Sequence, residues 1–149
     1  MGDGNTVSAG RCFCGAVRFE FTGQPKWVIH CHCESCRRAV SSPMTTWLAV
    51  PNDRLTWTGS ARSYVSSPGA LRKFCGNCGA QVSFEHERFP DETHLYVASM
   101  DDPGAFRPSR HVFFEERLPW MDVHDDLPRF LKGSGKGARP DLHGPATES

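Results

Sequence analysis

One short stretch decides the fold, the segment Cys75-Gly76-Asn77-Cys78-Gly79. A Cys-x-x-Cys turn brings two thiolate sulfurs to one metal ion, and thiolate is a soft ligand that favours zinc in tetrahedral sites. Gly76 and Gly79 stand where the backbone must turn tightly around the metal. Because two cysteines supply only half of a tetrahedron, the segment needs a second pair of ligands from elsewhere in the chain.

Cys12 and Cys14 are the obvious second pair. Side chains two residues apart in an extended segment lie on the same face, so a Cys-x-Cys sequence presents both sulfurs together. We therefore predict one structural zinc held by Cys12, Cys14, Cys75 and Cys78. The alternative for the last two is a thioredoxin-type redox pair, which should follow a strand and open a helix. Residues 80–85 alternate like a strand instead, which argues against the redox alternative.

The remaining three cysteines lie together in Cys31-His32-Cys33-Glu34-Ser35-Cys36. Three local sulfurs can hold one zinc and leave the fourth position for water or substrate, which distinguishes catalytic from structural zinc. Three thiolates around a divalent ion leave the site with a charge of about −1, which weakens the ion as a Lewis acid. Such a site favours holding a thiol as a nucleophilic thiolate, so we predict that Cys31, Cys33 and Cys36 form a second, catalytic zinc site.

Two alternatives stay open for this second site. His111 is distant in sequence and can reach the ion, which would close the tetrahedron and make the zinc structural. His30 and His32 point to the opposite face if the segment is extended. The three thiols can also carry no metal, or be oxidised.

Alternation of apolar and polar residues predicts a mainly β fold of short strands. Val17, Phe19 and Phe21 alternate with charged residues, the pattern of a half-buried strand. One or two helical turns are expected over residues 34–40 because Ser41-Ser42-Pro43 stops them. Further short strands are expected at residues 27–29, 45–50, 55–57, 80–85, 95–99 and 111–114.

Composition narrows the partners and the compartment. The 149 residues carry 17 basic and 17 acidic side chains, so the net charge is zero and no basic footprint for nucleic acid is present. No apolar run reaches the roughly 18 residues that a membrane span needs. The first eleven residues contain no apolar stretch, so we expect no secretory signal and a cytoplasmic, reducing location.

The chain divides into three expected parts. Residues 1–9 are expected to be a flexible lead, residues 10–131 one zinc-binding β domain, and residues 132–149 a disordered tail rich in Gly, Ser, Pro and charge. Short exposed strands would allow a homodimer.

Taken in order, the cysteine blocks resemble a known family. The resemblance is carried by Gly10-Arg-Cys-Phe-Cys-Gly-Ala-Val17, by Cys31-His-Cys-Glu-Ser-Cys-Arg37 and by Phe74-Cys-Gly-Asn-Cys-Gly79. The stretches His111–Trp120 and Asp126–Phe130 are similar to the closing segment of the same family. The family is that of the glutathione-dependent formaldehyde-activating enzymes, which also includes centromere protein V. The resemblance runs from about residue 10 to residue 130.

The resemblance implies a fold, two metals and an activity. The fold would be a β-tent of short antiparallel strands, with the structural zinc on Cys12, Cys14, Cys75 and Cys78. A catalytic zinc would lie on Cys31, Cys33 and Cys36. The family's activity is carbon–sulfur lyase chemistry, the reversible joining of glutathione and formaldehyde as S-hydroxymethylglutathione. The alternatives are a non-catalytic, zinc-stabilised binding module and a thiol-based redox protein.

Glutathione as substrate would need further side chains. Its two carboxylates call for cations, and four of these lie beside the cysteine blocks, either as substrate contacts or as ordinary solvated charges: Arg37, Arg38, Arg72 and Lys73. The nearest candidates for acid–base chemistry are His32, His111 and Glu34.

Overall fold

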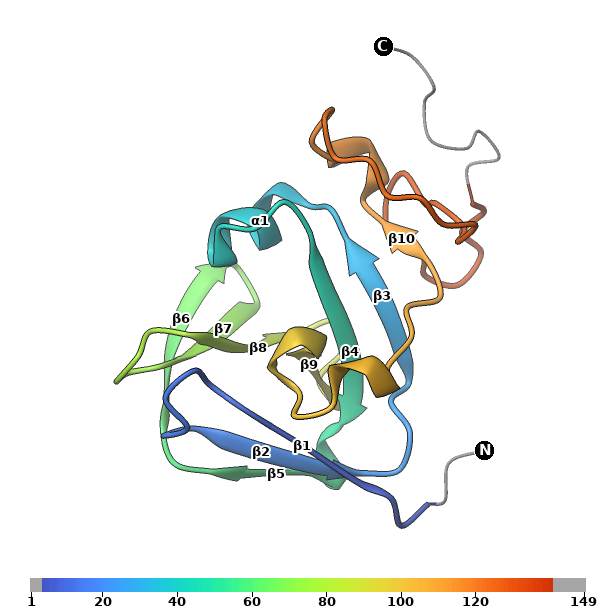
Figure 1. The fold of residues 1–149 in the computed structure, drawn as a ribbon. Helices are drawn as coiled ribbons and strands as arrows, with labels where there is room; N and C mark the ends of the chain where they lie inside the picture. Colours follow the sequence, from blue (N-terminus) through green and yellow to red (C-terminus); the bar gives the residue numbers. More distant parts are fainter. Residues whose placement is uncertain (1–3, 141–149) are drawn as a thin grey trace. The chain divides into compact units, whose positions relative to one another are not determined.

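The structure is a computed structural model that describes residues 4–140, and it confirms the mainly β prediction (Figure 1). The chain forms two compact units, each built from two stretches. Unit 1 comprises the described parts of Met1–Trp27 and Trp47–Arg107, and unit 2 those of Val28–Thr46 and Pro108–Ser149. Among the described residues, no helix is both long enough and apolar enough to span a bilayer.

A three-stranded antiparallel sheet forms the first part of unit 1. Its strands, in spatial order, are β1 (Val7–Arg11), β2 (Arg18–Thr22) and β5 (Leu55–Thr58). In β2 the side chains of Phe19 and Phe21 are buried while their neighbours are exposed, which confirms the alternation seen in the sequence. The Phe19 ring meets the Trp57 ring of β5 edge-on, with centroids 5.4 Å apart.

The second part of unit 1 is an antiparallel run of strands that contains the Cys75 block. Their spatial order is β4 (Thr45–Pro51), β9 (Glu92–Tyr96), β8 (Gln81–His86), β7 (Ala70–Cys75) and β6 (Ala61–Ser67). β4 enters unit 1 at Trp47. One row of directly opposed residues crosses all five strands: Tyr64, Arg72, Phe84, His94 and Ala49. Side chains in such a row share one face of the sheet.

Unit 2 holds the α-helix of the described range and a short parallel strand pair. β3 (Trp27–Cys31) begins at the last residue of unit 1 and pairs with β10 (His111–Val112). α1 (Glu34–Val40) has Cys33 as its N-cap, whose sulfur accepts a hydrogen bond from the Cys36 amide at 3.3 Å. The helix ends at Ser41, whose φ of 52° is left-handed, just before the predicted stop at Pro43.

Three strands lie where none was expected. β1 begins at Val7, inside the stretch expected to be a flexible lead, and β6 and β7 form a hairpin that closes at Pro68 and Gly69. β6 is exposed along most of its length, so it carries no apolar alternation to find. The expected strand at residues 95–99 is only partly right, because β9 ends at Tyr96 and a 3₁₀ turn covers Val97–Ser99.

The expected disordered tail lies partly outside the described residues. Residues 132–140 contain no helix or strand, and residues 141–149 are not described. Lys132 and Ser134 still contact unit 2, since the Lys132 carbonyl accepts from the Phe113 amide and the Ser134 hydroxyl accepts from Arg110 Nε. The three-part division of the chain remains a prediction.

Candidate metal centres

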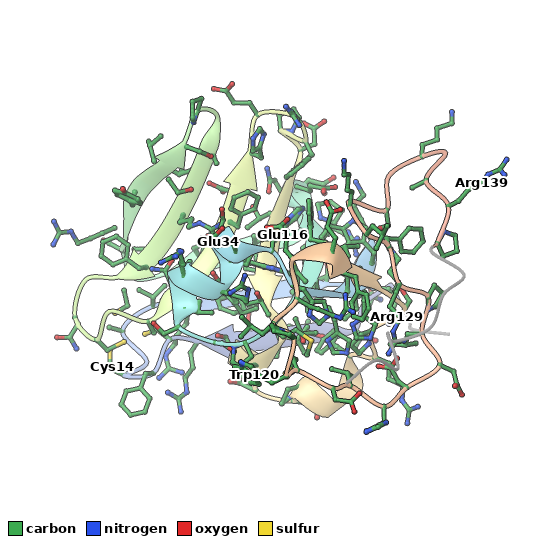
Figure 2. The ribbon with its side chains drawn as sticks, turned by 90° about the horizontal axis from the view of Figure 1, so that it is seen from above. Cys14, Glu34, Glu116, Trp120, Arg129 and Arg139 are labelled. Carbon is green, nitrogen blue, oxygen red and sulfur yellow. The ribbon has the colours of Figure 1, made fainter. Side chains whose placement is uncertain are left out.

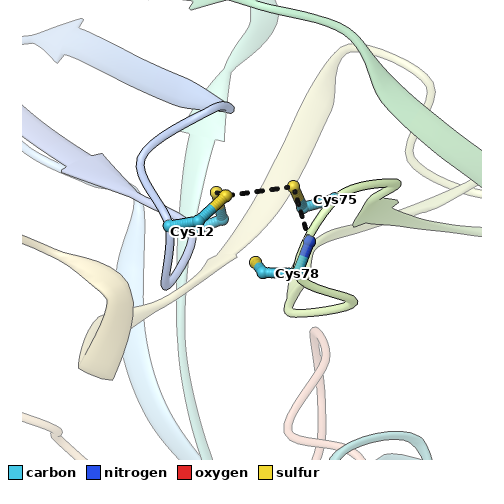
Figure 3. Close-up of side chains that lie close together, drawn as sticks. Cys12, Cys75 and Cys78 are labelled. Atoms are coloured by element: carbon cyan, nitrogen blue, oxygen red, sulfur yellow. Dashed lines mark hydrogen bonds between the residues drawn. The ribbon is translucent and has the colours of Figure 1, made fainter.

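The four cysteines predicted to share one metal ion come together in unit 1. Cys12 and Cys14 lie between β1 and β2, Cys75 ends β7, and Cys78 lies in the turn that leads to β8. Their sulfurs all lie within 4.8 Å of one another. Figure 3 shows Cys12, Cys75 and Cys78 converging from two separate loops. This spacing suits four ligands around one ion.

Amide donors surround these sulfurs. Val17 N donates to Cys12 Sγ at 3.3 Å, and Asn77 N donates to Cys75 Sγ at 3.4 Å. The Asn77 side chain reaches across the site and donates to Cys14 Sγ at 3.2 Å. Hydrogen bonds to a sulfur stabilise its thiolate form, which is the form that binds metal.

The pKa values of these thiols follow from the same contacts. The hydrogen bond from Asn77 lowers the pKa of Cys14, and the backbone amide of Ala80 lowers the pKa of Cys78. Burial raises the pKa of Cys12, but the hydrogen bonds from Val17 and the neighbouring cysteines outweigh it and leave the pKa lowered. The backbone amides of Cys78 and Asn77 lower the pKa of Cys75, but burial and contacts with the Cys12 and Cys78 thiols leave it raised. Three of the four thiols therefore favour the thiolate form before any metal is considered.

The site is continuous with the hydrophobic core of unit 1. Cys12 and Cys75 are buried in a cluster with Val17 and Val82, while Cys14 is exposed, as Figure 2 shows. A metal ion here would tie two loops to that core, so the residues present fit a structural metal.

The second cysteine group lies in unit 2, where β3 meets α1. The sulfurs of Cys31, Cys33 and Cys36 lie within 4.8 Å of one another, with Cys31 Sγ 3.8 Å from Cys36 Sγ. Cys31 ends β3, Cys33 caps α1 and Cys36 lies in the first turn of α1, so three adjoining backbone conformations aim the sulfurs at one point.

Close packing keeps the Cys31 and Cys33 thiols protonated in the absence of a cation. Contact with Cys33 and Cys36, together with burial, raises the pKa of Cys31 strongly. A hydrogen bond with Cys31 lowers the pKa of Cys33, but contact with Cys36 and burial raise it to about 11. Three neighbouring thiolates repel one another, and a divalent cation among them removes that repulsion. The donor set fits a soft metal ion.

No fourth ligand completes this group among residues 4–140. The Cys31, Cys33 and Cys36 sulfurs gather without a histidine or carboxylate in reach. His111, the candidate for closing the site, uses both ring nitrogens elsewhere. His32 turns away from the sulfurs, as its position between Cys31 and Cys33 predicted, and donates to His111 instead.

A hydrogen-bonded chain begins at His32, the residue between Cys31 and Cys33, and runs through His111 to Asp125. The Asp125 carboxylate can only accept, so His111 Nε2, 3.0 Å from Asp125 Oδ2, carries a proton. His111 Nδ1 therefore accepts from His32 Nε2 at 2.8 Å. Burial lowers the pKa of His32 to about 4, and burial also lowers the pKa of His111. Both rings are fully buried and neutral near pH 7.

Arg129 fixes the carboxylate end of this chain. Its Nη1 donates to Asp125 Oδ1 at 2.6 Å, and Nη2 donates to the Val123 carbonyl at 2.9 Å. Burial raises the pKa of Asp125, but hydrogen bonds from His111 and Arg129 outweigh it and hold the pKa at about 2. His30, His111 and Asp125 also converge as possible ligands, but the guanidinium already neutralises the carboxylate and would repel a cation.

The four predicted cations separate into two kinds. Arg37 donates to the carbonyls of His32 and Glu116, and so holds α1 in unit 2. Arg38 pairs with Glu34 at the surface, and Lys73 pairs with Glu85 at 3.4 Å. Arg72 alone of the four is buried and has no hydrogen bond or ion pair from its side chain within the described range.

Glu34 is not placed to supply a proton. It is exposed and paired with Arg38 at 2.9 Å, a hydrogen bond that lowers its pKa. Its own backbone amide donates to Glu116 Oε1 at 3.0 Å. Sequence reasoning missed Asp125, because a lone aspartate in a loop carries no spacing signal. Arg129 belonged to the quoted closing segment, but nothing in its neighbours indicated burial.

Comparison with known proteins identifies the family. A family model described as glutathione-dependent formaldehyde-activating enzyme matches residues 7–116, more than half of the 149 residues. The chain belongs to this family. All seven cysteines fall inside the matched range, so both metal centres lie within the part that the glutathione-dependent formaldehyde-activating enzymes share.

Individual relatives are more distant. A protein of Halomonas elongata, provisionally named a glutathione-dependent formaldehyde-activating enzyme, is 26% identical over 125 residues, covering 76% of this chain and 79% of the relative. An uncharacterized lyase of Schizosaccharomyces pombe is 31% identical over 77 residues, covering 52% and 56%. A crystal structure of a Rhodobacter sphaeroides protein is similar in fold, with a TM-score of 0.52 and 24% identity over 62% of this chain and 87% of that one.

Proposed function

We propose that the protein is a zinc-dependent carbon–sulfur lyase that joins and separates a thiol and an aldehyde, with glutathione and formaldehyde as substrates. The observation that carries the proposal is the group Cys31, Cys33 and Cys36, which gathers three sulfurs with no fourth ligand among the described residues. Membership of the family supports the same chemistry, as do one relative named a glutathione-dependent formaldehyde-activating enzyme and another named a lyase.

The proposed chemistry balances without an oxidant. Cys31, Cys33 and Cys36 would hold the zinc ion, which when bound would lower the pKa of a substrate thiol. The substrate sulfur then forms a bond to the aldehyde carbon, and the carbonyl oxygen gains a proton to become a hydroxyl. The proton lost by the thiol equals the proton gained by the oxygen. The reverse reaction breaks the same carbon–sulfur bond.

The chain's own residues hold this site in shape. The Cys33 sulfur caps α1, and Arg37 ties the helix to the carbonyls of His32 and Glu116. The neutral pair of His32 and His111 is buried, so we assign it a positioning role behind the cysteines rather than a role in contact with substrate. Preorganised ligands keep the thiol and the aldehyde in one geometry, which contributes the orientation part of the rate enhancement.

A calorimetric titration of the zinc-loaded protein tests the proposal. Glutathione should bind and release close to one proton per site near neutral pH, measured in two buffers of different ionisation enthalpy. S-methylglutathione, whose sulfur cannot ionise, should bind much more weakly. Exchange spectroscopy by NMR should show faster interconversion of glutathione and S-hydroxymethylglutathione with the protein than without it. Equal affinity for glutathione and S-methylglutathione would contradict binding of the substrate thiol to zinc, and would favour a zinc-stabilised binding module.

Cellular context follows the substrates in this proposal. Glutathione and free thiolate ligands both belong to a reducing compartment, so we expect a cytoplasmic enzyme. Homodimer formation remains an expectation from the short strands.

A further inference from the structure

The four cysteines of the first metal centre, all in unit 1, differ in their exposure to solvent. Cys12 and Cys75 are only 2% and 1% exposed, and Cys78 is partly buried. Cys14 is exposed. Four protein ligands close a structural zinc site, so an incoming ligand can reach the ion only by displacing one of them. The exposed sulfur is the one that such a ligand meets first.

Backbone donors hold the two buried sulfurs. Val17 N donates to Cys12 Sγ at 3.3 Å, and this hydrogen bond is buried. Cys78 N donates to Cys75 Sγ at 3.5 Å (Figure 3). Because the donors belong to the main chain, neither sulfur can turn away from the site unless a loop moves with it.

Cys14 is held from the opposite loop by a side chain. Asn77 Nδ2 donates to Cys14 Sγ at 3.2 Å, whereas the Ala16 amide, which also donates to this sulfur, belongs to the loop of Cys14 itself. The Cys14 sulfur also lies 3.7 Å from that of Cys12 and 3.8 Å from that of Cys75. Hydrogen bonds between sulfurs need a thiol proton, which metal-bound thiolates lack. The Asn77 amide can therefore still hold Cys14 when an ion is bound.

We propose that Cys14 is the ligand through which the four-cysteine site exchanges its ion, and that Asn77 is the residue that holds this ligand in place. During exchange Cys14 gives up its bond to the ion while a donor atom of an incoming ligand takes its place, so no oxidant or reductant is needed. The inference rests on metal binding by the four cysteines, which is part of the proposed function. It does not depend on lyase chemistry at the second cysteine group.

The order of reaction among the four sulfurs gives the first test. Zinc-loaded protein is treated with iodoacetamide, and each cysteine is followed separately by peptide mass spectrometry. Among the four ligands Cys14 should be alkylated first, because this reagent modifies thiolates that solvent reaches. Alkylation of Cys12, Cys75 or Cys78 before Cys14 would overturn the assignment.

Substitution of Asn77 gives the second test. Asn77→Ala removes the donor, so alkylation of Cys14 should be faster by roughly threefold or more. Asn77→Asp places a carboxylate beside the thiolate, and repulsion between them should make alkylation faster still. Loss of zinc to a chelator should accelerate in the same order, in the phase that coincides with the change in circular dichroism.

Asn52→Ala is the matched control. Asn52 is likewise an exposed asparagine of unit 1 with a side-chain hydrogen bond, since its Nδ2 donates to the Pro90 carbonyl at 3.1 Å. Within residues 4–140 its hydrogen bonds involve none of the four cysteines. Its alkylation and zinc-loss rates should equal those of wild type. Asn77 does not have a positive φ, so alanine suits the backbone at that position.

The remaining outcomes separate this inference from the lyase chemistry. Unchanged rates at Cys14 in both Asn77 variants would overturn the role of Asn77. Equal rates at all four cysteines, or faster alkylation of Cys14 without faster zinc loss, would overturn the role of Cys14. If glutathione releases no proton at the second cysteine group while Cys14 still reacts first and Asn77→Ala accelerates it, the inference stands and the lyase proposal fails.

Discussion

The partly buried Asp125 carboxylate organises several contacts in unit 2. It accepts from His111 and Arg129 at once, and so connects the closing segment to the strand pair of β3 and β10. Its pKa of about 2 lies below the ordinary value of 3.8. The carboxylate is therefore more stable ionised in the folded protein than in the unfolded chain.

Replacing Asp125 by asparagine should make stability depend less on pH. A carboxyl with a depressed pKa stabilises the fold above its unfolded pKa, and loses that contribution as pH falls through the folded pKa. Asp125→Asn should therefore unfold more easily at pH 7, by about 2 kcal/mol for a shift of this size. The difference in the free energy of unfolding between Asp125→Asn and wild type should become smaller as pH falls from about 4 towards about 2.

Urea unfolding at several pH values measures that gap. Asp122→Asn is the control, because Asp122 is exposed and pairs only with the exposed His124 among the contacts that the structure describes. A gap between Asp125→Asn and wild type that stays constant between pH 5 and pH 3 would show that the carboxylate does not contribute through its charge.

Cys33 offers a substitution that separates metal binding from folding. Serine is a favoured helix N-cap, so Cys33→Ser should retain the cap of α1 while losing the sulfur ligand. We expect about one metal ion less per chain and a nearly unchanged circular dichroism spectrum, measured alongside elemental analysis. Ser35→Ala, in the same turn of α1, should keep both metals. Unfolding of Cys33→Ser would instead mean that the second site is structural.

Prediction from sequence succeeded for residues whose chemistry depends on spacing. The cysteines could be grouped because a turn or an extended segment fixes where neighbouring sulfurs point, and the structure brings both groups together. Asp125 could not be found in this way, since its partner His111 lies 14 residues away. Arg72 was named as a cation, but its isolation depends on three-dimensional burial that a sequence does not display.

Among the elements, the Cys75–Cys78 turn is the one whose loss should matter most. A metal shared with Cys12 and Cys14 closes a long loop, since Cys14 and Cys75 are 61 residues apart. Structural zinc contributes on the order of 10 kcal/mol to small domains. Cys75→Ser should therefore give insoluble or largely unfolded protein, judged by melting and metal content. A variant with wild-type melting and full metal content would show the pairing to be wrong.

Two glycines in turns provide a graded test of backbone geometry. Gly59, between β5 and β6, has a φ of +83°, and an added Cβ would lie 2.0 Å from the Ala16 carbonyl oxygen. Gly79 has a φ of +78°, but an added Cβ would meet nothing within 4 Å. Gly79→Ala should cost about 1 kcal/mol from the left-handed backbone alone.

Gly59→Ala should lower the free energy of unfolding by clearly more than Gly79→Ala. The new Cβ would clash with the Ala16 backbone, and this clash adds to the strain of the left-handed backbone. Chemical denaturation of both variants gives the comparison. Equal decreases in the free energy of unfolding would mean that the loop around Ala16 moves away from the new Cβ without loss of stability.

Strands were predictable where burial alternates and unpredictable where it does not. β2 alternates between exposed and buried residues, and α1 ends where a stop was expected. β6 is exposed along most of its length, so its pairing with β7 is fixed by backbone hydrogen bonds rather than by an apolar pattern. Local pattern therefore predicts half-buried elements and overlooks hairpins that lie on the surface.

At the scale of the whole molecule, each compact unit carries one cysteine group. Chelator titration of the zinc-loaded protein should therefore proceed in two steps. The open group of Cys31, Cys33 and Cys36 should lose its ion first, with little change in circular dichroism. The four-cysteine group should release its ion later, together with unfolding. A single step in which both ions and the fold are lost together would contradict separate roles for the two sites.

The division into two units was not visible in the sequence. Each unit is assembled from two stretches, so the boundaries fall inside β3 and β4 rather than in a Gly- or Pro-rich linker. Linkers can be recognised by composition because their residues are exposed and are rich in Pro, Gly and polar side chains. A strand that passes from one unit into the other has the composition of any other strand, so it gives no such signal.

The separation of the ligands along the chain sets an order of events during translation. Cys31, Cys33 and Cys36 leave the ribosome almost together, so this group can take up its ion while most of the chain is still unmade. Cys12 and Cys14 must wait for Cys75, 61 residues after Cys14, or roughly 3 to 12 seconds at about 5–20 residues per second. During that interval the nascent chain displays two reactive thiols without their partners. With zinc bound as proposed, the four-cysteine site is filled last, so a shortage of zinc in those seconds would lower the yield of folded chain.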